Sequence, residues 1–281
     1  MTTIPPHLRA LLDTVQARVF AGLRDTVQCC DWLALAQALP DNSVDLCLSD
    51  IPYNTTQLAW ESEIDLVEWW QQMRRVMKPH RAVVMTGSQP FTSRLVMSNP
   101  AWFRYEWIWE KPIATQFLDA KTRPLKAHEN VLVFYGGQPV YNPQMTKGTP
   151  YETNPKAPPT SIYGSHYRIA TLNEGQRYPR TVLQFENERG YHPTQKPVAL
   201  FEYLIRTYTR PGDLVFDPFV GSGTTALAAR NTGRHWITGD LSPEYVGIAR
   251  ARLAEPYTPD MFTALEQPAE PVAEQRTLFG W

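Results

Sequence analysis

The chain has 281 residues and a net charge of −1, which suits one large domain and excludes a protein coated on all sides with basic residues. No stretch approaches the roughly 20 consecutive apolar residues of a membrane span, and the first residues lack the layout of a secretion signal. Cys29, Cys30 and Cys47 are unevenly spaced and form no metal-binding or disulfide pattern, so we expect a cytoplasmic protein without a metal site.

Helical and strand-like segments alternate along most of the chain. Apolar residues at helical spacing predict helices, and short apolar runs between turn residues predict strands. The predicted helices cover residues 8–24, 33–39, 65–77 and 198–208, with another that begins near Thr224. The predicted strands cover residues 44–48, 82–86, 105–109, 130–135, 214–216 and 235–239. This alternation predicts an α/β fold with a doubly wound, mostly parallel sheet and helices on both faces.

Residues 136–190 break the alternation, because they are rich in Pro, Gly, Tyr, Thr and Asn and show no sustained period. An irregular stretch of this length inside a compact domain is usually functional or disordered. Five tyrosines favour an ordered, functional segment: Tyr141, Tyr151, Tyr163, Tyr167 and Tyr178.

The most specific motif covers residues 215–225, where Asp217 ends a strand and a turn with Gly221 and Gly223 leads into a helix. A strand, a glycine turn and a helix form the first half of a doubly wound unit, which binds ligands at the carboxyl ends of its strands. The turn lacks the Lys of a phosphate loop and the third glycine of a dinucleotide fingerprint. Asp240 ends the next predicted strand, where a ribose diol is usually held. The pattern favours a nucleoside cofactor without phosphates, with helix-capping acids as the alternative.

A second group of polar and aromatic residues, Asp50-Ile51-Pro52-Tyr53, follows the predicted strand 44–48. It also lies where a strand of the predicted sheet reaches its carboxyl end. Considered without the glycine motif, it fits a simple turn whose tyrosine packs on the core.

Together with His192-Pro-Thr-Gln-Lys-Pro197, these motifs resemble those of the S-adenosylmethionine-dependent amino-methyltransferases of DNA. The early catalytic motif and late glycine motif resemble the permuted beta group, which methylates the exocyclic amine of adenine or, less often, cytosine. The resemblance covers roughly residues 27–135 and 191–253. It implies a Rossmann-like methyltransferase fold, S-adenosylmethionine as cofactor and double-stranded DNA as substrate. It also divides the chain into a catalytic half (1–135), a target-recognition insertion (136–190), a cofactor-binding half (191–254) and a mobile acidic tail (255–281).

The resemblance assigns the catalytic loop. Asp50 and the carbonyl of Ile51 would accept hydrogen bonds from the target amine, after the base has flipped out of the duplex. Tyr53 would stack on the extruded base. Ile51 replaces a proline that is commoner in the family, but Pro52 still favours an extended backbone before it.

The resemblance also assigns a cofactor site. Asp217 and the glycine turn would approach the methionine part, and Asp240 would take the ribose hydroxyls. Asp31 would accept from the adenine amine of the cofactor, and Lys196 would bind the methionine part or backbone carbonyls near it. The assigned residues are Asp31, Lys196, Asp217, Phe219, Gly221, Ser222, Gly223, Thr224, Thr225 and Asp240.

Basic residues gather in the middle of the chain, where residues 111–185 hold nine Lys or Arg against four acids. Residues 254–281 hold one Arg against five acids. A basic middle between acidic ends suggests one face for a polyanion, and we expect Lys121, Arg123 and Lys126 to contact DNA. Solvated loop charges are the alternative.

The acidic tail ends on Gln275-Arg-Thr-Leu278-Phe279, with Trp281 after it. Gln-x-x-Leu-Phe resembles the peptide by which bacterial replication and repair proteins dock on the sliding clamp. Packing of these apolar side chains on the protein's own surface is the simpler interpretation.

The sequence therefore predicts a site-specific adenine-N6 DNA methyltransferase, such as those of restriction-modification systems. Cytosine-N4 enzymes more often have Ser at the first position of the catalytic motif; Ser49 is adjacent, but Pro52-Tyr53 sets the register and assigns Asp50. A catalytically idle DNA-binding relic of the fold is the alternative from another class. The recognition sequence and the oligomeric state, a dimer included, stay open.

Overall fold

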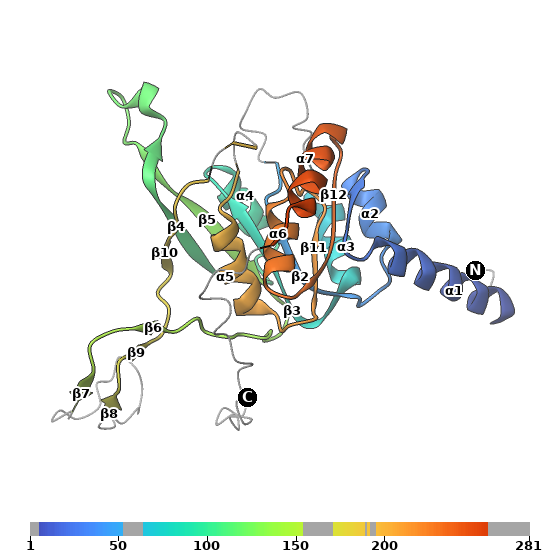
Figure 1. Ribbon diagram of the computed structural model, residues 1–281, viewed down its shortest axis with the longest axis horizontal. Coiled ribbons are helices and arrows are strands. Elements are labelled where there is room, and N and C mark those ends of the chain that lie inside the picture. Colours follow the sequence, from blue (N-terminus) through green and yellow to red (C-terminus); the bar gives the residue numbers. More distant parts are fainter. Residues whose placement is uncertain (1–5, 53–63, 154–170, 189, 192–194, 258–281) are drawn as a thin grey trace.

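The structure is a computed structural model that describes residues 6–52, 64–153, 171–188, 190–191 and 195–257, with side chains described from residue 14 onward. Figure 1 shows a central sheet with helices on both faces. Tyr53, His192 and the clamp-like motif Gln275–Phe279 lie outside the described residues. Of the described helices, none is long and apolar enough to cross a membrane.

The main sheet has eight strands in the order β1-β12-β11-β2-β3-β5-β4-β10. Strand β5 is antiparallel to β3 and β4, and the other neighbouring pairs are parallel. The predicted mostly parallel, doubly wound sheet is therefore confirmed. The strands are β1 (Thr26–Cys29), β2 (Val44–Ser49), β3 (Met77–Gly87), β4 (Phe103–Thr115), β5 (Lys126–Phe134), β10 (Val182–Gln184), β11 (Leu214–Asp217) and β12 (His235–Asp240).

Helices bury apolar side chains against both faces of this sheet. Helices α2 (Trp32–Ala38), α3 (Leu66–Val76) and α4 (Phe91–Ser98) share one hydrophobic cluster, and α5 (Val198–Tyr208) and α6 (Thr224–Asn231) share another. Successive residues of β11 point to opposite faces, because Leu214 and Phe216 pack in the first cluster and Val215 in the second. Burial on both faces explains the continuous apolar runs Leu214–Phe216 of β11 and Leu46–Leu48 of β2.

Two further helices flank the sheet near β1. Helix α7 (Pro243–Ala254) packs on β1 and α6 in a smaller apolar cluster, and α1 (Pro6–Leu23) leads into β1. The sequence pattern did not predict α4 or α7. Helix α7 buries only Val246, Ala249 and Arg252. Two apolar residues and one arginine do not form an apolar stripe from which a helix can be predicted.

Strands β4 and β5 are longer than the predicted segments 105–109 and 130–135. Their additional residues include Lys111, Lys126 and Glu129, whose charges interrupt the apolar pattern. These side chains are bound in polar contacts with one another and with their neighbours, so the strands continue where the sequence pattern ends.

The segment that lacks a pattern, 136–190, contains very short strands in its described parts. Strands β6 (Thr146–Lys147) and β9 (Gln176–Arg177) pair with each other, as do β7 (Tyr151–Thr153) and β8 (Thr171–Asn173). In Figure 1 these pairs form an arm that extends away from the main sheet. Strands of two or three residues are too short to show alternation, which is why the sequence did not predict them.

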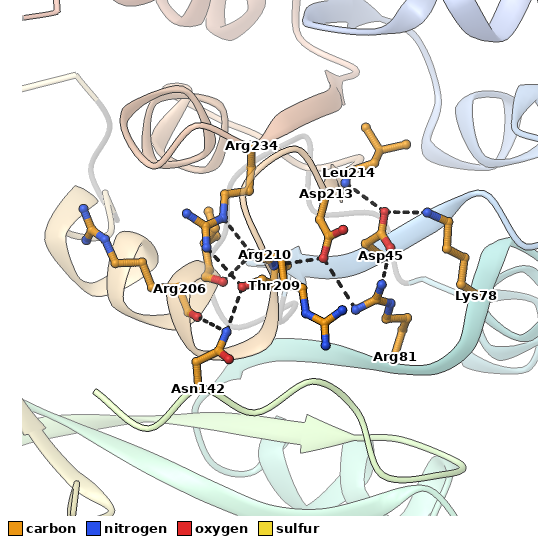
Figure 2. A network of polar contacts seen from close by, with 11 residues as sticks. Asp45, Lys78, Arg81, Asn142, Arg206, Thr209, Arg210, Asp213, Leu214 and Arg234 are labelled. Atoms are coloured by element: carbon orange, nitrogen blue, oxygen red, sulfur yellow. Dashed lines mark hydrogen bonds and ion pairs between the residues drawn. The ribbon is translucent and has the colours of Figure 1, made fainter. Parts of the chain in front are cut away.

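A polar network holds the amino ends of the strands together (Figure 2). The buried Asp45 of β2 binds Lys78 at 2.7 Å and Arg81 at 2.9 Å, both from β3, and accepts the backbone N–H of Leu214 at 3.0 Å. Arg81 also lies 3.5 Å from Asp213, just before β11. Asp45 thus joins three neighbouring strands at the end of the sheet opposite Asp50.

The same end anchors the start of the 136–190 segment. The Asn142 side chain donates to the carbonyls of Arg206 at 3.0 Å and Thr209 at 2.9 Å, at the carboxyl terminus of α5. Arg234 donates to the same Thr209 carbonyl at 3.0 Å. Figure 2 shows Asn142 and Arg234 converging on this helix end.

Candidate active site

Strands β11 and β2 are parallel neighbours at the point where the chain changes direction across the sheet. From β11 the chain continues to β12 on one side, whereas from β2 it continues to β3 on the other. Such a switch point leaves a crevice at the carboxyl ends of the strands, where ligands bind in doubly wound folds. Asp217 ends β11, and Asp50 follows the end of β2.

Asp217 is 1 % exposed and binds groups from three segments. Its Oδ1 accepts from the Ser49 hydroxyl at 2.6 Å and the Phe219 N–H at 3.0 Å, and its Oδ2 accepts from the Thr225 hydroxyl. Burial raises the pKa of Asp217 to about 7, although the three hydrogen bonds act in the opposite direction. Asp217 therefore joins β2 to the glycine turn and to the first residues of α6.

The glycine turn has a backbone that other residues rarely adopt. Gly221 and Gly223 have φ values of 51° and 91°, in the left-handed region. A Cβ on Gly223 would lie 2.9 Å from the Cβ of Ala249, so the turn also needs glycine for close packing against α7. Arg252 of α7 donates to the Ser222 carbonyl at 2.7 Å and holds the turn from outside.

Asp240 connects the turn to the end of β12. Its carboxylate accepts from the Gly221 N–H at 3.0 Å and the Ser242 N–H at 2.8 Å. A carboxylate offers about four acceptor positions, so these bonds are compatible with further donors such as ribose hydroxyls. Asp31 follows β1, the neighbour of β12, and caps α2 by accepting the Leu33 N–H at 2.9 Å.

An aromatic group lies beside these carboxylates. The ring of Phe219 is 6.3 Å from Trp32 and 6.0 Å from Trp69, between ring centroids. No sequence motif assigned Trp32 or Trp69 to the site. Trp69 is fully buried, whereas Trp32 and Phe219 are partly exposed between Asp31 and the glycine turn, and their apolar rings suit a nucleoside base, which has an apolar face and polar edges.

Asp50 is partly exposed at the end of β2 and is held from two sides. Its Oδ1 accepts from the Thr86 hydroxyl of β3, and its Oδ2 accepts from the Lys196 ammonium at 2.6 Å. The side chain of Asp50 is 24 % exposed, whereas that of Lys196 is 5 % exposed. Lys196 thus reaches Asp50 from a buried position just before α5.

Lys196 also belongs to a chain of charges that continues into the β4–β5 hairpin. It lies 3.3 Å from Glu129 of β5, and Glu129 binds Lys111 of β4. Burial would raise the pKa of Glu129, but the charges of Lys196 and Lys111 outweigh it and lower the pKa to about 2. Burial acts to lower the pKa of Lys196, but Asp50 and Glu129 raise it above its ordinary value.

The other assigned residues divide between this site and the hairpin. Ile51 is buried, and the Thr224 hydroxyl donates to the Lys196 carbonyl at 3.3 Å. Lys126 binds the Ser88 hydroxyl, and burial lowers its pKa. Lys121 and Arg123 are exposed near the tip of the hairpin, where Arg123 binds Asp119.

Four neighbouring strand ends therefore carry most of the assigned residues: Asp31, Asp240, Asp217 with the glycine turn, and Asp50. Sequence reasoning missed Thr86, Lys111 and Glu129. Each contacts the site only across the sheet, and Glu129 is 67 positions before Lys196, so no local spacing points to it. Within the described residues, no group of three or more His, Cys, Asp or Glu is arranged to hold a metal ion.

A family model for DNA methylases, N6_N4_Mtase, matches residues 44–251. The chain belongs to this family of DNA amino-methyltransferases. It is 28 % identical to the Type II methyltransferase M.HpaI of Haemophilus parainfluenzae, with 80 % of this chain and 73 % of that protein covered. Both the fold and the matched region include the site around Asp50 and Asp217.

Solved structures of methyltransferases share the fold of this DNA methylase. The M1.HpyAVI complex with S-adenosylmethionine is 25 % identical, with a TM-score of 0.58 over 82 % of this chain and 99 % of that chain. The PvuII DNA methyltransferase, which is cytosine-N4-specific, is 20 % identical, with a TM-score of 0.59 over 85 % and 91 % of the two chains. The Rossmann-like methyltransferase fold and S-adenosylmethionine as the cofactor are thus established, and the nucleoside cofactor expected from the glycine motif is confirmed.

Proposed function

We propose that this DNA methylase methylates the 6-amino group of adenine in a flipped-out base, with Asp50 as the acceptor that binds the target amine. The family includes both adenine and cytosine enzymes, so relatedness does not choose between them. One observation carries the proposal: the Ser49 hydroxyl is fully buried and donates to Asp217 at 2.6 Å. Ser49 is therefore engaged within the core, which leaves Asp50 as the polar residue at the first position of the motif.

The cofactor site that we propose lies along the ends of β1, β12 and β11. Asp240 would accept the ribose hydroxyls and Asp31 the adenine amine, with Trp32 and Phe219 against the base. The glycine turn, with Ser222, Thr224 and Thr225, would surround the methionine part next to Asp217. When bound there, S-adenosylmethionine supplies a methyl group on a positively charged sulfur.

The chain's own part in the reaction is to orient the amine. An aromatic exocyclic amine is a weak nucleophile, because its lone pair is delocalised into the ring. Asp50 and the carbonyl of Ile51 would accept both amine hydrogens, which favours a pyramidal nitrogen and stabilises the positive charge that develops on it. Thr86 and Lys196 hold the Asp50 carboxylate in place for this task. Tyr53 would stack on the extruded base.

Nucleoside analysis of double-stranded DNA after incubation with labelled S-adenosylmethionine tests the proposal. We expect label in N6-methyladenine, and label in N4-methylcytosine would replace the proposal with the cytosine alternative. A folded protein that binds the cofactor but labels no DNA would support the idle relic.

The Asp50→Ala variant tests the catalytic loop. We expect methyl transfer to fall on the order of 10²-fold or more, because a preorganised acceptor is removed, while calorimetry shows unchanged cofactor binding. Turnover like that of the wild type would remove Asp50 from the proposed role.

The wider setting is also a proposal. M.HpaI is named a Type II methyltransferase, which supports site-specific modification within a restriction-modification system. The three cysteines are free, which fits a reducing cytoplasm. Docking on a sliding clamp through Gln275–Phe279 is tested by binding a peptide of residues 270–281 to purified clamp, beside a Leu278→Ala, Phe279→Ala peptide. Equal binding of the two peptides, or none, would end that idea.

A further inference from the structure

The tip of the β4–β5 hairpin exposes large apolar side chains that the fold does not use. Phe117 is 74 % and Leu118 is 85 % exposed, and Ile113 and Leu125 flank them at 57 % and 47 %. Figure 1 shows this hairpin projecting well beyond the rest of the sheet. Four exposed apolar residues within thirteen positions form a patch of the kind that marks an interaction surface.

The tip is an ordered turn and not a loose loop. Gln116 has a left-handed backbone with φ of 67°, and Phe117–Asp119 form one turn of 3-10 helix (η1). Backbone N–H groups of Ala120 and Arg123 donate to the carbonyls of Phe117 at 3.2 Å and Asp119 at 3.0 Å. Phe117 and Leu118 are therefore presented by a backbone that is already arranged for contact.

The charges around the patch favour a polyanion. Between Pro112 and Ala127 the basic residues Lys121, Arg123 and Lys126 face a single acid, Asp119, which is already paired with Arg123. Apolar side chains among excess basic residues suit DNA, which offers phosphates outside and apolar base faces inside.

The hairpin also connects this tip to the catalytic residues. Its strands carry Lys111 and Glu129, and Glu129 contacts Lys196, which binds Asp50. Phe117 is six positions after Lys111, which corresponds to at most about 20 Å of extended chain. A duplex whose target base reaches Asp50 therefore lies within reach of the tip.

We propose that Phe117 and Leu118 form an apolar wedge that enters the base stack beside the target and fills the space left by the flipped base. The inference rests on the proposed function, since it requires a base that leaves the duplex. Extrusion breaks stacking contacts, and an inserted apolar side chain replaces part of them. The flanking Lys121 and Arg123 would bind the phosphates on either side.

The test compares a Phe117→Ser, Leu118→Ser double variant with a Val67→Ser, Met97→Ser double variant. Val67 and Met97 are 68 % and 71 % exposed on α3 and α4, so the control removes similar apolar surface elsewhere. Single-turnover methylation is measured on a duplex that contains the site methylated by the wild type, and on the same duplex with an abasic position opposite the target. Thermal melting verifies that both variants are folded.

We expect the Phe117→Ser, Leu118→Ser variant (the wedge variant) to methylate the intact duplex about tenfold to a hundredfold more slowly than the wild type. The rate falls because the equilibrium constant for flipping the base falls by the same factor. On the abasic duplex, where the target base is no longer paired, the rate should return to near that of the wild type. A 2-aminopurine at the target position should show reduced fluorescence with the wedge variant on the intact duplex, and the control variant should match the wild type throughout.

Equal rates for the wedge variant and the wild type on the intact duplex would overturn the proposal. An equal loss on both duplexes, with a change from dimer to monomer in sedimentation, would also overturn it and assign the tip to contact between two copies of the chain. The proposed function is tested by a different result: it fails when the wild type places no label in adenine. In that case the fluorescence of 2-aminopurine still measures whether Phe117 and Leu118 promote flipping.

Discussion

Asp50 and Asp217 lie at the carboxyl ends of the neighbouring strands β2 and β11, but they differ in exposure and in binding partners. Asp50 is partly exposed and binds Lys196, whereas Asp217 is buried against two hydroxyls and a backbone N–H. Two carboxylates whose environments differ in this way take different roles. In the proposed function Asp50 binds the target amine, and Asp217 connects β2 to the glycine turn.

Replacing Lys196 with Met should lower kcat by about tenfold or more, because the Asp50 carboxylate loses a partner that holds its orientation. The dissociation constant for S-adenosylmethionine should change little, and Lys196→Arg should recover part of the rate. Asp240→Ala is the matched control, since loss of a ribose acceptor should weaken cofactor binding. A large loss of cofactor affinity in Lys196→Met with unchanged kcat would instead place Lys196 in the cofactor site.

Replacing Asp217 with Asn should change how stability depends on pH. The pKa of Asp217 is raised to about 7 in the folded protein, so the neutral form is favoured there and the wild type loses stability as pH rises from about 4 to about 7. Asn cannot ionise and should remove this loss, which amounts to about 4 kcal/mol for roughly three pKa units at 1.36 kcal/mol per unit, with about two of those units above pH 5. Urea unfolding at pH 5 and pH 8 measures it, and parallel pH profiles for the two proteins would contradict the assignment.

The two ends of the sheet carry different groups of polar residues. The carboxyl ends of β1, β12, β11 and β2 carry the candidate site, whereas the amino ends of β2, β3 and β11 are joined by Asp45 and its partners (Figure 2). A network at the amino ends can stabilise the strands without contacting substrate, because ligands of this fold bind at the opposite edge.

Asp45→Asn should therefore lower stability with little effect on kcat. Loss of the buried charge removes the carboxylate that Lys78 and Arg81 share and leaves Arg81 with only its 3.5 Å contact to Asp213. Breaking a buried ion pair typically costs about 3–5 kcal/mol. Asp41→Asn is the control, because the Asp41–Arg75 pair lies at the surface and is worth about 0–1 kcal/mol. Equal urea midpoints for the two variants would show that the network contributes little.

The hairpin tip lies far from helix α1 in the molecule. Figure 1 shows α1 at one end and the β4–β5 hairpin and the β6–β9 arm at the other. The described parts of the arm carry Lys147 and Arg177 against Glu152 and Glu174, whereas the hairpin tip carries Lys121 and Arg123 against Asp119, so the net charge of −1 conceals a small basic surface at the hairpin tip. A local basic surface, and not the average charge, decides how a protein meets DNA.

A Lys121→Gln, Arg123→Gln variant should weaken DNA binding and reduce the salt dependence of the affinity by roughly one unit of slope for each phosphate that the variant no longer binds. The control is Arg18→Gln, Arg24→Gln, which removes two exposed charges in and just after α1, at the other end of the molecule. Titrations at several salt concentrations give both slopes. The prediction is wrong if the hairpin variant keeps the slope of the wild type.

Periodicity and turn residues were sufficient to predict most of the fold. The helix 198–208 was predicted at its observed bounds, and the strand around Val215 was predicted from a short apolar run that is buried on both faces. Local sequence determines such elements, because the spacing of apolar residues sets which periodic structure can bury them. The charged ends of β4 and β5 escaped prediction, since their burial depends on partners from other strands.

The same division holds for the site. The glycine turn and the Asp50 motif are each a continuous stretch of sequence, so their resemblance to the family, and with it the S-adenosylmethionine cofactor, could be inferred from the sequence alone. Contacts between distant residues could not: Ser49 binds Asp217 across 168 positions, and Lys196 binds Asp50 across 146. These pairs form because strand order brings separate segments to one edge of the sheet, and strand order is a property of the folded chain that no local pattern encodes.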